Sequence, residues 1–596
     1  HTAYRRQRQM CIRDRLCTDV AFAPLLRPVG MAAGRTERTP LVAAAPLHEH
    51  AENDEALLAQ ESAFSAMYGA THGGDPSASL FMPTDDSVPP PTAAPSTYSL
   101  LDRVSVMSTM WIGTFLAALD TTMVATVMSQ VGSEFAVSNT VAWLGTSYML
   151  TQMACQPLYG RLSDAFGRRA MTLFASSVFF VGTLSCGLSR TFVQLCIARA
   201  MAGLGGSGLT SLATMVVSDM TRVQARATWQ GLGNVIFAIG AALGGPLGGA
   251  VVDAQWGWRW AFLLQVPLCA AHLLFVFAKV RIPSGPGSVR DKVLRIDMGG
   301  TLALLCAVAA LVAALACGDA DGPRLLVYLW LAGAVIGAGV FVWLETRVAA
   351  EPLMPTQILA RRMPACVSLA CGLVSLCQFG VLYHVPLYFL AVQGTSTVQA
   401  GAYLVPNVLA ASVCSLVSGR LVSRTGSYRA TVLLSGLLTV LGALSMCFWS
   451  RRATPAWAYW LTMPWVGAGF GSTLTVTLVA LVLSVDPMEV APASGVTYLF
   501  RAVGSILGVS CTHSLFQRSL AWYLRRTPLP ARLVHDMRAD IGTLATLTGA
   551  SRTWAVSAYE TSMHAVFVWL LCLSLAALAC LCCVRAHVAP PHRRPP

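Results

Sequence analysis

Charged residues are scarce in this sequence. Asp, Glu, Lys and Arg together make up only 12% of its 596 residues, whereas 55% are hydrophobic. A soluble domain carries about 25% charged residues, so this chain has too little polar surface for a protein surrounded by water. Its apolar runs of about 20 residues can each cross a hydrocarbon core about 30 Å thick, whereas a membrane β-barrel would show shorter alternating segments. We therefore expect an all-α polytopic membrane protein.

Signatures of several enzyme classes are also missing. The sequence has no Gly-x-x-x-x-Gly-Lys-Ser/Thr motif, which excludes an ATP motor of that type. It has no pair of Cys-x-x-Cys motifs at metal-binding spacing, and most of its 18 cysteines stand singly in apolar runs, where they behave as small apolar residues. We therefore expect no enzyme activity, no cofactor, no metal and no disulfide framework.

The apolar runs number fourteen and define the expected topology. The expected helices are 104–129, 141–159, 170–189, 191–218, 227–251, 259–279, 298–317, 324–344, 364–391, 399–418, 429–449, 456–484, 494–516 and 562–584. Lys and Arg concentrate in alternate loops, and the positive-inside rule then places both termini in the cytosol. The long loop 517–561 falls on the non-cytosolic side. The net charge of +13 is thus mainly a topology signal, and we expect no nucleic-acid partner.

The N-terminal part of the chain is polar. Its first residues match one reading frame of a transposon end that is used in sequencing, so we expect 1–30 to be a non-native leader, with a natural disordered tail as the alternative. Residues 31–100 are rich in Pro, Ala, Ser and Thr, which predicts a disordered cytosolic tail. Within this tail, Glu37, Leu41 and Val42 resemble an acidic dileucine signal for a sorting adaptor.

The chain contains an internal repeat. Gly160-Arg-Leu followed by Gly167 recurs as Gly419-Arg-Leu followed by Gly426, and a set of three further glycines recurs at nearly the same offset. Two related six-helix bundles with an inserted helix pair explain this offset, and such parallel halves are a transporter design with the substrate site between them. The expected N-terminal bundle, insert, C-terminal bundle and cytosolic tail are residues 101–282, 283–363, 364–586 and 587–596.

The stretch GRLSDAFGRR resembles the signature loop between helices 2 and 3 of the major facilitator superfamily. Its motif residues are Gly160, Asp164, Gly167, Arg168 and Arg169. The resemblance implies a cytosolic latch, in which the acid caps a neighbouring helix end and the arginines pair with acids. Such a latch would hold the cytosolic side closed and break when the halves move apart. A basic loop that only sets the topology is the alternative.

The fifth expected helix carries a stretch that resembles the antiporter signature of the same family. Its residues are Gly240, Gly244, Gly245, Pro246, Gly248 and Gly249. Gly240, Gly244 and Gly248 are spaced by four and allow close helix packing, which suits a tight seam between the halves, with ordinary helix packing as the alternative. The segments at 119–124 (LDTTMV) and 258–267 (WRWAFLLQVP) resemble the fourteen-span drug:proton antiporter branch. Gln265 stands in the second segment where that branch carries Asn. In having Gln at this position, the chain resembles the yeast-type vacuolar basic amino acid transporters.

Charged residues inside the expected spans are few, and each costs at least about 2.5–3.5 kcal/mol at a helix centre. Asp120, Arg199 and Arg501 are therefore candidates for coupling protons to substrate. We expect Asp120 to carry a proton or anchor a cationic substrate, with a structural salt bridge as the alternative. Arg199 is a relay or structural partner, and Arg501 faces a helix interface. The polar residues expected to line the path are Tyr148, Gln152, Gln156, Gln265, Gln378, His384 and Asn407.

The resemblance implies a proton-coupled secondary antiporter that works by alternating access. We expect a monomer in the lipid bilayer, with protons and a small molecule as its partners. Two substrate classes stay open. Gln265 and the sorting-like tail favour uptake of basic amino acids into the vacuole, whereas the branch as a whole favours efflux of drugs at the plasma membrane. A transporter-like nutrient sensor is the third reading, which loss of Asp120 would have favoured.

Overall fold

The computed structural model describes most of the chain from the first expected span onward. The described residues are 100–137, 140–221, 223–254, 256–280, 298–319, 324–348, 354, 356–425, 427–485, 489–539 and 542–584. The sorting-like residues Glu37, Leu41 and Val42 lie outside this part, and so does the side chain of Asp164.

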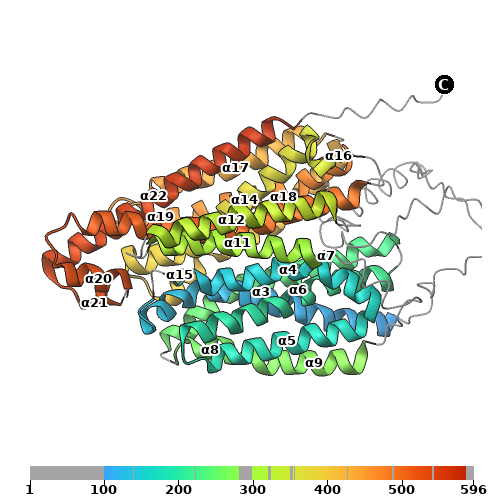
Figure 1. The fold of residues 1–596 in the computed structure, drawn as a ribbon, viewed down its shortest axis with the longest axis horizontal. Coiled ribbons are helices and arrows are strands. Elements are labelled where there is room, and N and C mark those ends of the chain that lie inside the picture. The colour runs from blue at the N-terminus through green and yellow to red at the C-terminus, as the bar shows by residue number, and fades with distance from the viewer. Residues whose placement is uncertain are drawn as a thin grey trace, which may run out of the picture. The chain divides into compact units, whose positions relative to one another are not determined.

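Every regular element in the described part is helical (Figure 1). The N-terminal half consists of α3 (Leu100–Glu134), α4 (Trp143–Phe166), α5 (Arg168–Leu188), α6 (Phe192–Met220), α7 (Val223–Asp253), α8 (Arg259–Leu263) and α9 (Val266–Lys279). The insert consists of α11 (Met298–Asp319) and α12 (Arg324–Arg347). The C-terminal half consists of α13 (Thr356–Leu359), α14 (Arg362–Tyr388), the π-helix η2 (Phe389–Gln393), α15 (Thr397–Ala402), α16 (Val405–Thr425), α17 (Arg429–Cys447), α18 (Ala456–Val482), α19 (Val490–Leu524), α20 (Ala531–Ala539), α21 (Thr543–Thr546) and α22 (Gly549–Cys582).

Thirteen helices among the described residues are long and apolar enough to cross a membrane. Their positions match thirteen of the fourteen expected spans. The remaining span corresponds to α4, a helix of 24 residues that is not among the thirteen. Its sequence includes Gln152 and Gln156, so its residues are more polar on average than those of its neighbours. The helix is nevertheless in place, packed against α6.

Two of the expected spans are interrupted where the sequence carries proline. The span 259–279 divides into α8 and α9 at Gln265, and Pro267 occupies the first turn of α9, where a missing backbone N–H costs little. In α14, Pro386 lies inside the helix and the chain then continues as η2. A proline removes an intrahelical hydrogen bond, which explains the change of helix type at this point.

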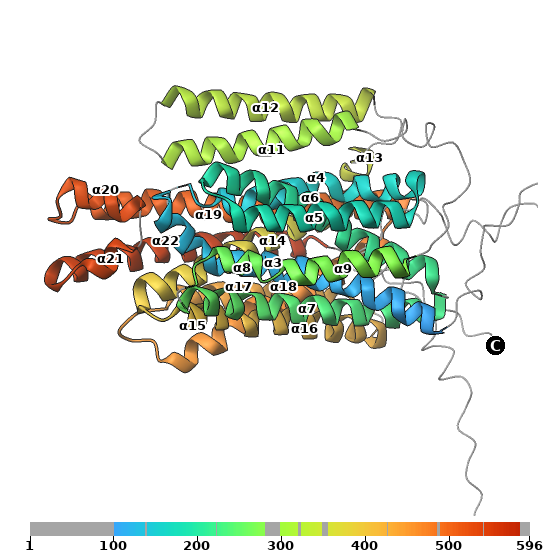
Figure 2. The ribbon, with the colours of Figure 1, turned by 90° about the horizontal axis from the view of Figure 1, so that it is seen from below.

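Each half packs around its own central helices, and the insert lies to one side. In the N-terminal half α3 packs on α7 and α5 packs on α6, while in the C-terminal half α14 packs on α19 and α16 packs on α18. The insert pairs α11 with α12, and α11 also contacts α4 and α19 (Figure 2). Because α12 is mostly exposed within the chain, it is positioned to face lipid.

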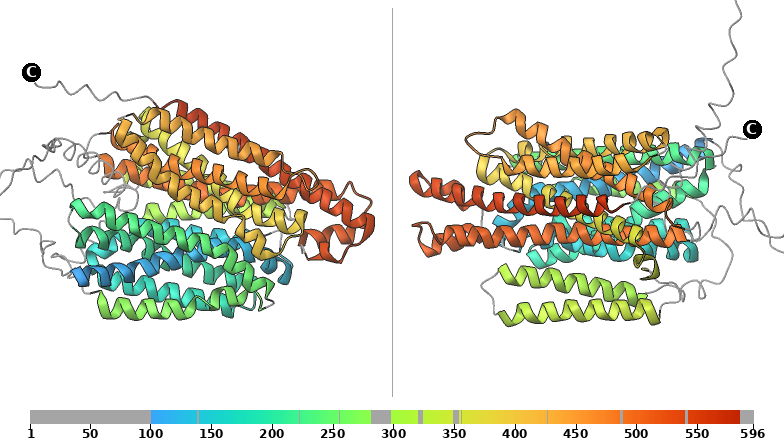
Figure 3. Two further views of the ribbon diagram at one scale, coloured as in Figure 1. Left: turned by 180° about the vertical axis from the view of Figure 1, so that it is seen from behind. Right: turned by 90° about the horizontal axis from the view of Figure 1, so that it is seen from above.

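The segment expected to be a long loop, 517–561, is mostly helical. The helix α19 has 35 residues and continues to Leu524, and α22 begins at Gly549, well before the expected start of the last span. At 1.5 Å per residue α19 is about 52 Å long, which exceeds the thickness of the hydrocarbon core. The ends of α19 and α22 project with α20 and α21 between them (Figure 3). The expected loop is therefore an ordered helical cap.

Candidate functional site

A buried ion pair joins α3 to α6 in the N-terminal half. Both Asp120 carboxylate oxygens accept hydrogen bonds from Arg199 Nη1, at 2.8 and 2.7 Å. The two residues are 0% and 1% exposed. Sequence reasoning had selected both residues separately, and the structure brings them together. A pair of this kind is costly to break by removing one partner, because the other charge is then left buried and unpaired.

The arginine of this pair is enclosed by α4 and α8. Its Nε donates to the carbonyl oxygen of Leu144 at 3.3 Å. The Tyr148 ring lies 4.4 Å from the guanidinium carbon and the Phe262 ring lies 5.7 Å away. These aromatic faces favour a cation. Tyr148, which we predicted to line the path, therefore covers the charged pair.

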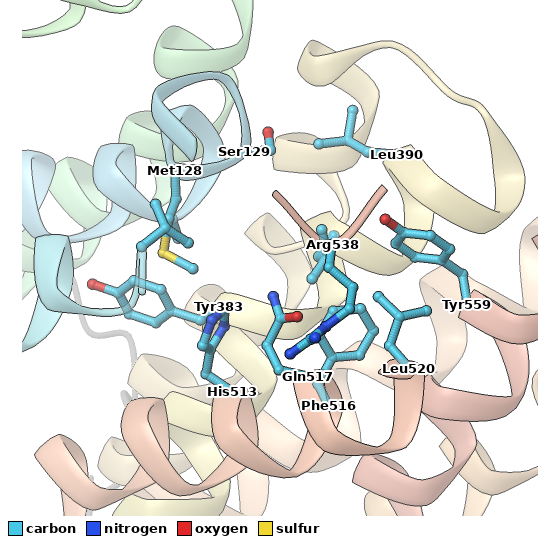
Figure 4. Close-up of a pocket in the computed structure, with 13 residues that line it drawn as sticks. Met128, Ser129, Tyr383, Leu390, His513, Phe516, Gln517, Leu520, Arg538 and Tyr559 are labelled. Atoms are coloured by element: carbon cyan, nitrogen blue, oxygen red, sulfur yellow. The ribbon is translucent and has the colours of Figure 1, made fainter. Parts of the chain in front are cut away.

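The side of α4 that holds the ion pair also meets the C-terminal half. Gly145 follows Leu144, and a Cβ atom at Gly145 would lie 2.6 Å from the hydroxyl oxygen of Tyr383 on α14. Tyr383 is 2% exposed and also lines a cavity at the junction of the halves (Figure 4). Tyr383 therefore lines this cavity and also lies against α4 next to Leu144, whose carbonyl oxygen binds Arg199.

The other predicted path residues are divided between the two halves. Gln265 is buried and its Nε2 donates to the carbonyl oxygen of Ala261 at 3.1 Å. On α14, Gln378 Nε2 donates to Asn407 Oδ1 of α16 at 2.6 Å. These two buried side chains link neighbouring helices of the C-terminal half. This hydrogen bond gives each buried amide one of the partners that it needs inside the bundle.

The remaining candidates have distinct surroundings. His384 is 1% exposed, and its Nδ1 lies 3.1 Å from the Gly380 carbonyl oxygen. The guanidinium carbon of Arg501 lies 4.9 Å from the Tyr498 ring on the same helix. Gln152 and Gln156 are half-buried on α4. The structure does not bring these residues to the ion pair.

The signature loop contacts its own half in this structure. Gly167 has φ +91°, a conformation that disfavours a side chain, and it lets α4 turn directly into α5. Arg168 Nε donates to Asp219 Oδ2 at the end of α6, at 2.8 Å. Arg169 Nη2 donates to the carbonyl oxygen of Phe277 on α9, at 2.9 Å. These contacts hold α5, α6 and α9 together, and the cytosolic latch between halves stays a prediction.

The glycines of α7 form two different packing faces. Gly240, Gly244 and Gly248 lie against α3 of the same half, close to Phe115, Thr122 and Thr126. The seam that we expected between the halves is instead made by the neighbouring face. Gly245 lies against Gly401 and Gly249 against Thr397, both on α15. One residue of offset turns the helix by about 100°, which separates the two faces.

An acid at the end of α7 reinforces this seam. Asp253 Oδ1 accepts from the backbone N–H of Thr397 at 3.0 Å, and its Oδ2 accepts from Val398 N–H at 2.9 Å. These are the first amides of α15, which lack partners within the helix. The Ser396 hydroxyl accepts from the Gln399 N–H one turn on. A carboxylate of the N-terminal half thus caps a helix of the C-terminal half.

Sequence reasoning missed Asp253, Tyr383 and Asp219. Asp253 and Asp219 lie at helix ends, where an acid is common and does not indicate a site. Tyr383 lies in an apolar span. A signal was available for Asp253, because it is an acid four residues after Gly249 and five before Trp258. Neither the cavity lined by Tyr383 nor a second one beside Trp111 and Trp229 is lined by the predicted path residues.

Comparison with known proteins identifies the architecture. The model of the Major Facilitator Superfamily matches residues 110–509, and the chain belongs to this family. It is therefore a multi-pass membrane transporter and not an enzyme. A solved bacterial homologue of the human lysosomal transporter Spinster, in an inward-facing and unoccupied conformation, has a TM-score of 0.57 at 15% identity. That comparison covers 81% of this chain and 97% of the other, and it supports the fold.

Two fungal relatives are similar over most of their length. The multidrug resistance protein fnx1 of Schizosaccharomyces pombe is 35% identical over 80% of this chain and 92% of its own. The vacuolar basic amino acid transporter 1 of Saccharomyces cerevisiae is 30% identical over 75% of this chain and 84% of its own. Their names refer to two different substrate classes.

Proposed function

We propose that this chain is a proton-coupled antiporter that moves basic amino acids into the vacuole in exchange for lumenal protons. The observation that carries the coupling is the buried pair of Asp120 and Arg199, in which Arg199 Nη1 donates to both carboxylate oxygens. While Asp120 is ionised, the pair holds α3 and α6 together. Protonation of the carboxylate removes its charge and weakens the ion pair. The contact therefore has a paired and a weakened state, and protonation shifts the equilibrium between them.

The position of the pair links this change to movement of the halves. Asp120 lies on α3, whose Leu119 and Thr122 contact Gly244 of α7. The neighbouring face of α7, which carries Gly245 and Gly249, forms the seam with α15. A change at Asp120 is therefore transmitted through one packed helix to the interface that must open and close. If the N-terminus is cytosolic, as the loop charges predict, this seam lies on the lumenal side.

The substrate and the membrane are proposed from the relatives and from Gln265. A relative named as a vacuolar basic amino acid transporter supports basic amino acids and the vacuole, and so does Gln265, which lies beside Met123 of α3. Drug efflux is the second candidate, because the relative named as a multidrug resistance protein is more similar. A transporter-like sensor is the third. An assay of gradient-driven uptake separates all three.

The test uses the purified full chain in proteoliposomes with an acidic interior. We expect labelled lysine to accumulate, and nigericin to abolish the accumulation by collapsing the pH gradient. Asp120→Asn should lower the initial rate of gradient-driven uptake at least about tenfold, or about 1.4 kcal/mol. The matched control is Glu134→Gln on the same helix, which removes an acid from a partly exposed ion pair with Arg259 and keeps an acceptor for the Trp258 indole N–H.

Each outcome separates the readings. Lysine uptake that survives nigericin, or that Asp120→Asn leaves unchanged, overturns the coupling. Gradient-driven movement of ethidium without movement of lysine replaces the amino acid reading by efflux. Binding of lysine without uptake of either compound identifies a sensor.

A further inference from the structure

Three cysteines gather at the end of the C-terminal half that lies away from the cap. Cys366 lies near the start of α14, whereas Cys580 and Cys583 lie at the end of α22. The Cys366 thiol is in hydrogen-bond contact with the Cys583 thiol, and the Cys580 thiol is close enough to interact electrostatically with both. The fold thus brings together two thiols from the first and the last long helix of this half.

Neighbouring cysteines on the same two helices have different surroundings. Further along α14, the buried Cys371 thiol lies 3.1 Å from the Thr477 hydroxyl oxygen of α18. Cys582 is exposed, although it stands beside Cys583 in the chain. The contact between α14 and α22 therefore singles out Cys366 and Cys583 among these thiols.

Buried neighbours hold the two thiols in place. Val367, which follows Cys366, is 0% exposed, and Leu581 on α22 is also 0% exposed. A Cβ atom at Gly436 of α17 would lie 2.8 Å from Leu581 Cδ1, so the end of α22 packs closely against α17. Cys366 and Cys583 themselves are half-buried, and a small oxidant can therefore reach them.

Two thiols that touch on a packed frame are suited to form a disulfide. If the N-terminus is cytosolic, as the loop charges predict, this end of the bundle faces the cytosol. Glutathione and thioredoxin keep thiols reduced there, so a disulfide in this compartment is transient and responds to oxidation. Such a bond differs from a permanent disulfide framework, which the sequence does not predict.

We propose that Cys366 and Cys583 form a redox-sensitive modification site, where glutathione disulfide converts the two thiols into a disulfide between α14 and α22. The Cys583 thiolate attacks one sulfur of glutathione disulfide, forms a mixed disulfide and releases one glutathione thiolate. The Cys366 thiolate then attacks the Cys583 sulfur and releases the second glutathione. Two protein thiols are oxidised, one glutathione disulfide is reduced to two molecules of glutathione, and the two thiol protons pass to the departing sulfurs.

The purified full chain in detergent tests the site directly. It is reduced, treated with glutathione disulfide, blocked with N-ethylmaleimide and digested, and mass spectrometry then measures the linked peptides. Because thiols held side by side react at a high effective molarity, we expect the Cys366 peptide to be linked to the Cys583 peptide at least about tenfold more often than to any other cysteine peptide. Dithiothreitol should reverse the link, and oxidation in denaturant should abolish the preference.

Serine variants assign the link to one sulfur of α22. Cys366→Ser and Cys583→Ser should each lower the amount of linked peptide at least about tenfold. Cys582→Ser is the matched control, because it removes an exposed thiol from the same turn, and it should form the link as the unmodified chain does. Melting without oxidant reports whether each variant is folded, and Cys583→Ala keeps the test valid if Cys583→Ser is unstable.

Hydrogen exchange shows whether the bond ties the helix ends. Oxidation should slow exchange in the first turn of α14 and the last turn of α22, because linked ends open less often. Cys583→Ser should show no slowing, and equal slowing in this variant would overturn the tie.

Each result with the linked peptides decides the proposal. A link that is equally abundant in Cys583→Ser and Cys582→Ser overturns the pairing. Glutathione that stays attached to single cysteines, with no link between α14 and α22, overturns the site. Equal preference in the folded and the denatured chain also overturns it, because the fold would then not be what brings the thiols together. None of these results depends on which substrate is transported.

Discussion

Replacement of Asp253 by Ala tests the seam between the two halves. The change removes both hydrogen bonds to the first amides of α15, at 3.0 and 2.9 Å. It leaves the glycine contacts of α7 in place. The closed arrangement at this end should therefore lose stability relative to the arrangement in which α7 and α15 separate.

The magnitude follows from helix capping. Loss of a capping side chain costs about 0.5–2 kcal/mol, and an acid near a helix N-terminus gains a further 0.3–1 kcal/mol when it is poorly screened. Asp253 is exposed, so solvent replaces part of each hydrogen bond and screens the charge. We therefore expect about 1–2 kcal/mol, which corresponds to about a five- to thirtyfold change in population.

Hydrogen exchange measures this change at the affected amides. In the unmodified chain the amides of Thr397 and Val398 exchange only when the seam opens, so their exchange rate reports the open population. Asp253→Ala should raise the rate in peptides covering residues 395–404 by about five- to thirtyfold. Asp253→Asn should have a smaller effect, since Asn also caps helices well.

The matched control is again Glu134→Gln. Glu134 ends α3 and pairs with Arg259 of its own half, at 2.7 Å, so its loss should leave exchange in residues 395–404 unchanged. Equal exchange in Asp253→Ala and the unmodified chain would refute the reasoning. An equal increase in both variants would show that any acid lost from the N-terminal half destabilises α15.

Two further predictions concern buried packing. Arg199→Gln leaves the Asp120 carboxylate buried and unpaired, so melting of the full chain should reveal a loss of about 3–5 kcal/mol. Adding Asp120→Asn should recover most of that loss, and a double variant as unstable as the single one would contradict the pairing. A Cβ at Gly244 would overlap Thr122 Oγ1, so Gly244→Ala should lower both the melting temperature and the amount of folded chain. Gly339→Ala, which meets nothing within 4 Å, should change neither, and equal losses would exclude close packing as the cause.

The helices could be predicted from the sequence because the hydropathy of a segment shows whether lipid or water surrounds it. Apolar length placed the spans, and in the structure Pro386 and Pro267 lie where the helix geometry changes. The cap could not be predicted in this way. Residues 517–561 are more polar than a span, and polarity does not distinguish a loop from a helix that leaves the bilayer. The docking of Met537 under Tyr559 is a tertiary contact.

The sequence allowed the residues of the site to be predicted, but not which of them contact one another. A charge in an apolar span is rare enough to select Asp120 and Arg199 separately, but their separation of 79 positions contains no register that would join them. The glycine spacing predicted a packed face on α7, but the seam between the halves was the wrong partner for Gly240, Gly244 and Gly248, which pack on α3. The sequence therefore could not distinguish the contact of Gly244 with α3 from that of Gly245 with α15.

The two faces of α7 mean that one helix is subject to two kinds of selection. The contact of Gly240, Gly244 and Gly248 with α3 lies within one half, so movement of the halves relative to each other leaves it in place. In the proposed transport cycle, the contact of Gly245 and Gly249 with α15 would form and separate each time the halves move. Side chains added to the first face reduce how much transporter a cell contains, whereas side chains added to the second reduce how fast each copy turns over. Protein abundance and turnover per molecule thus separate residues that are adjacent in the chain.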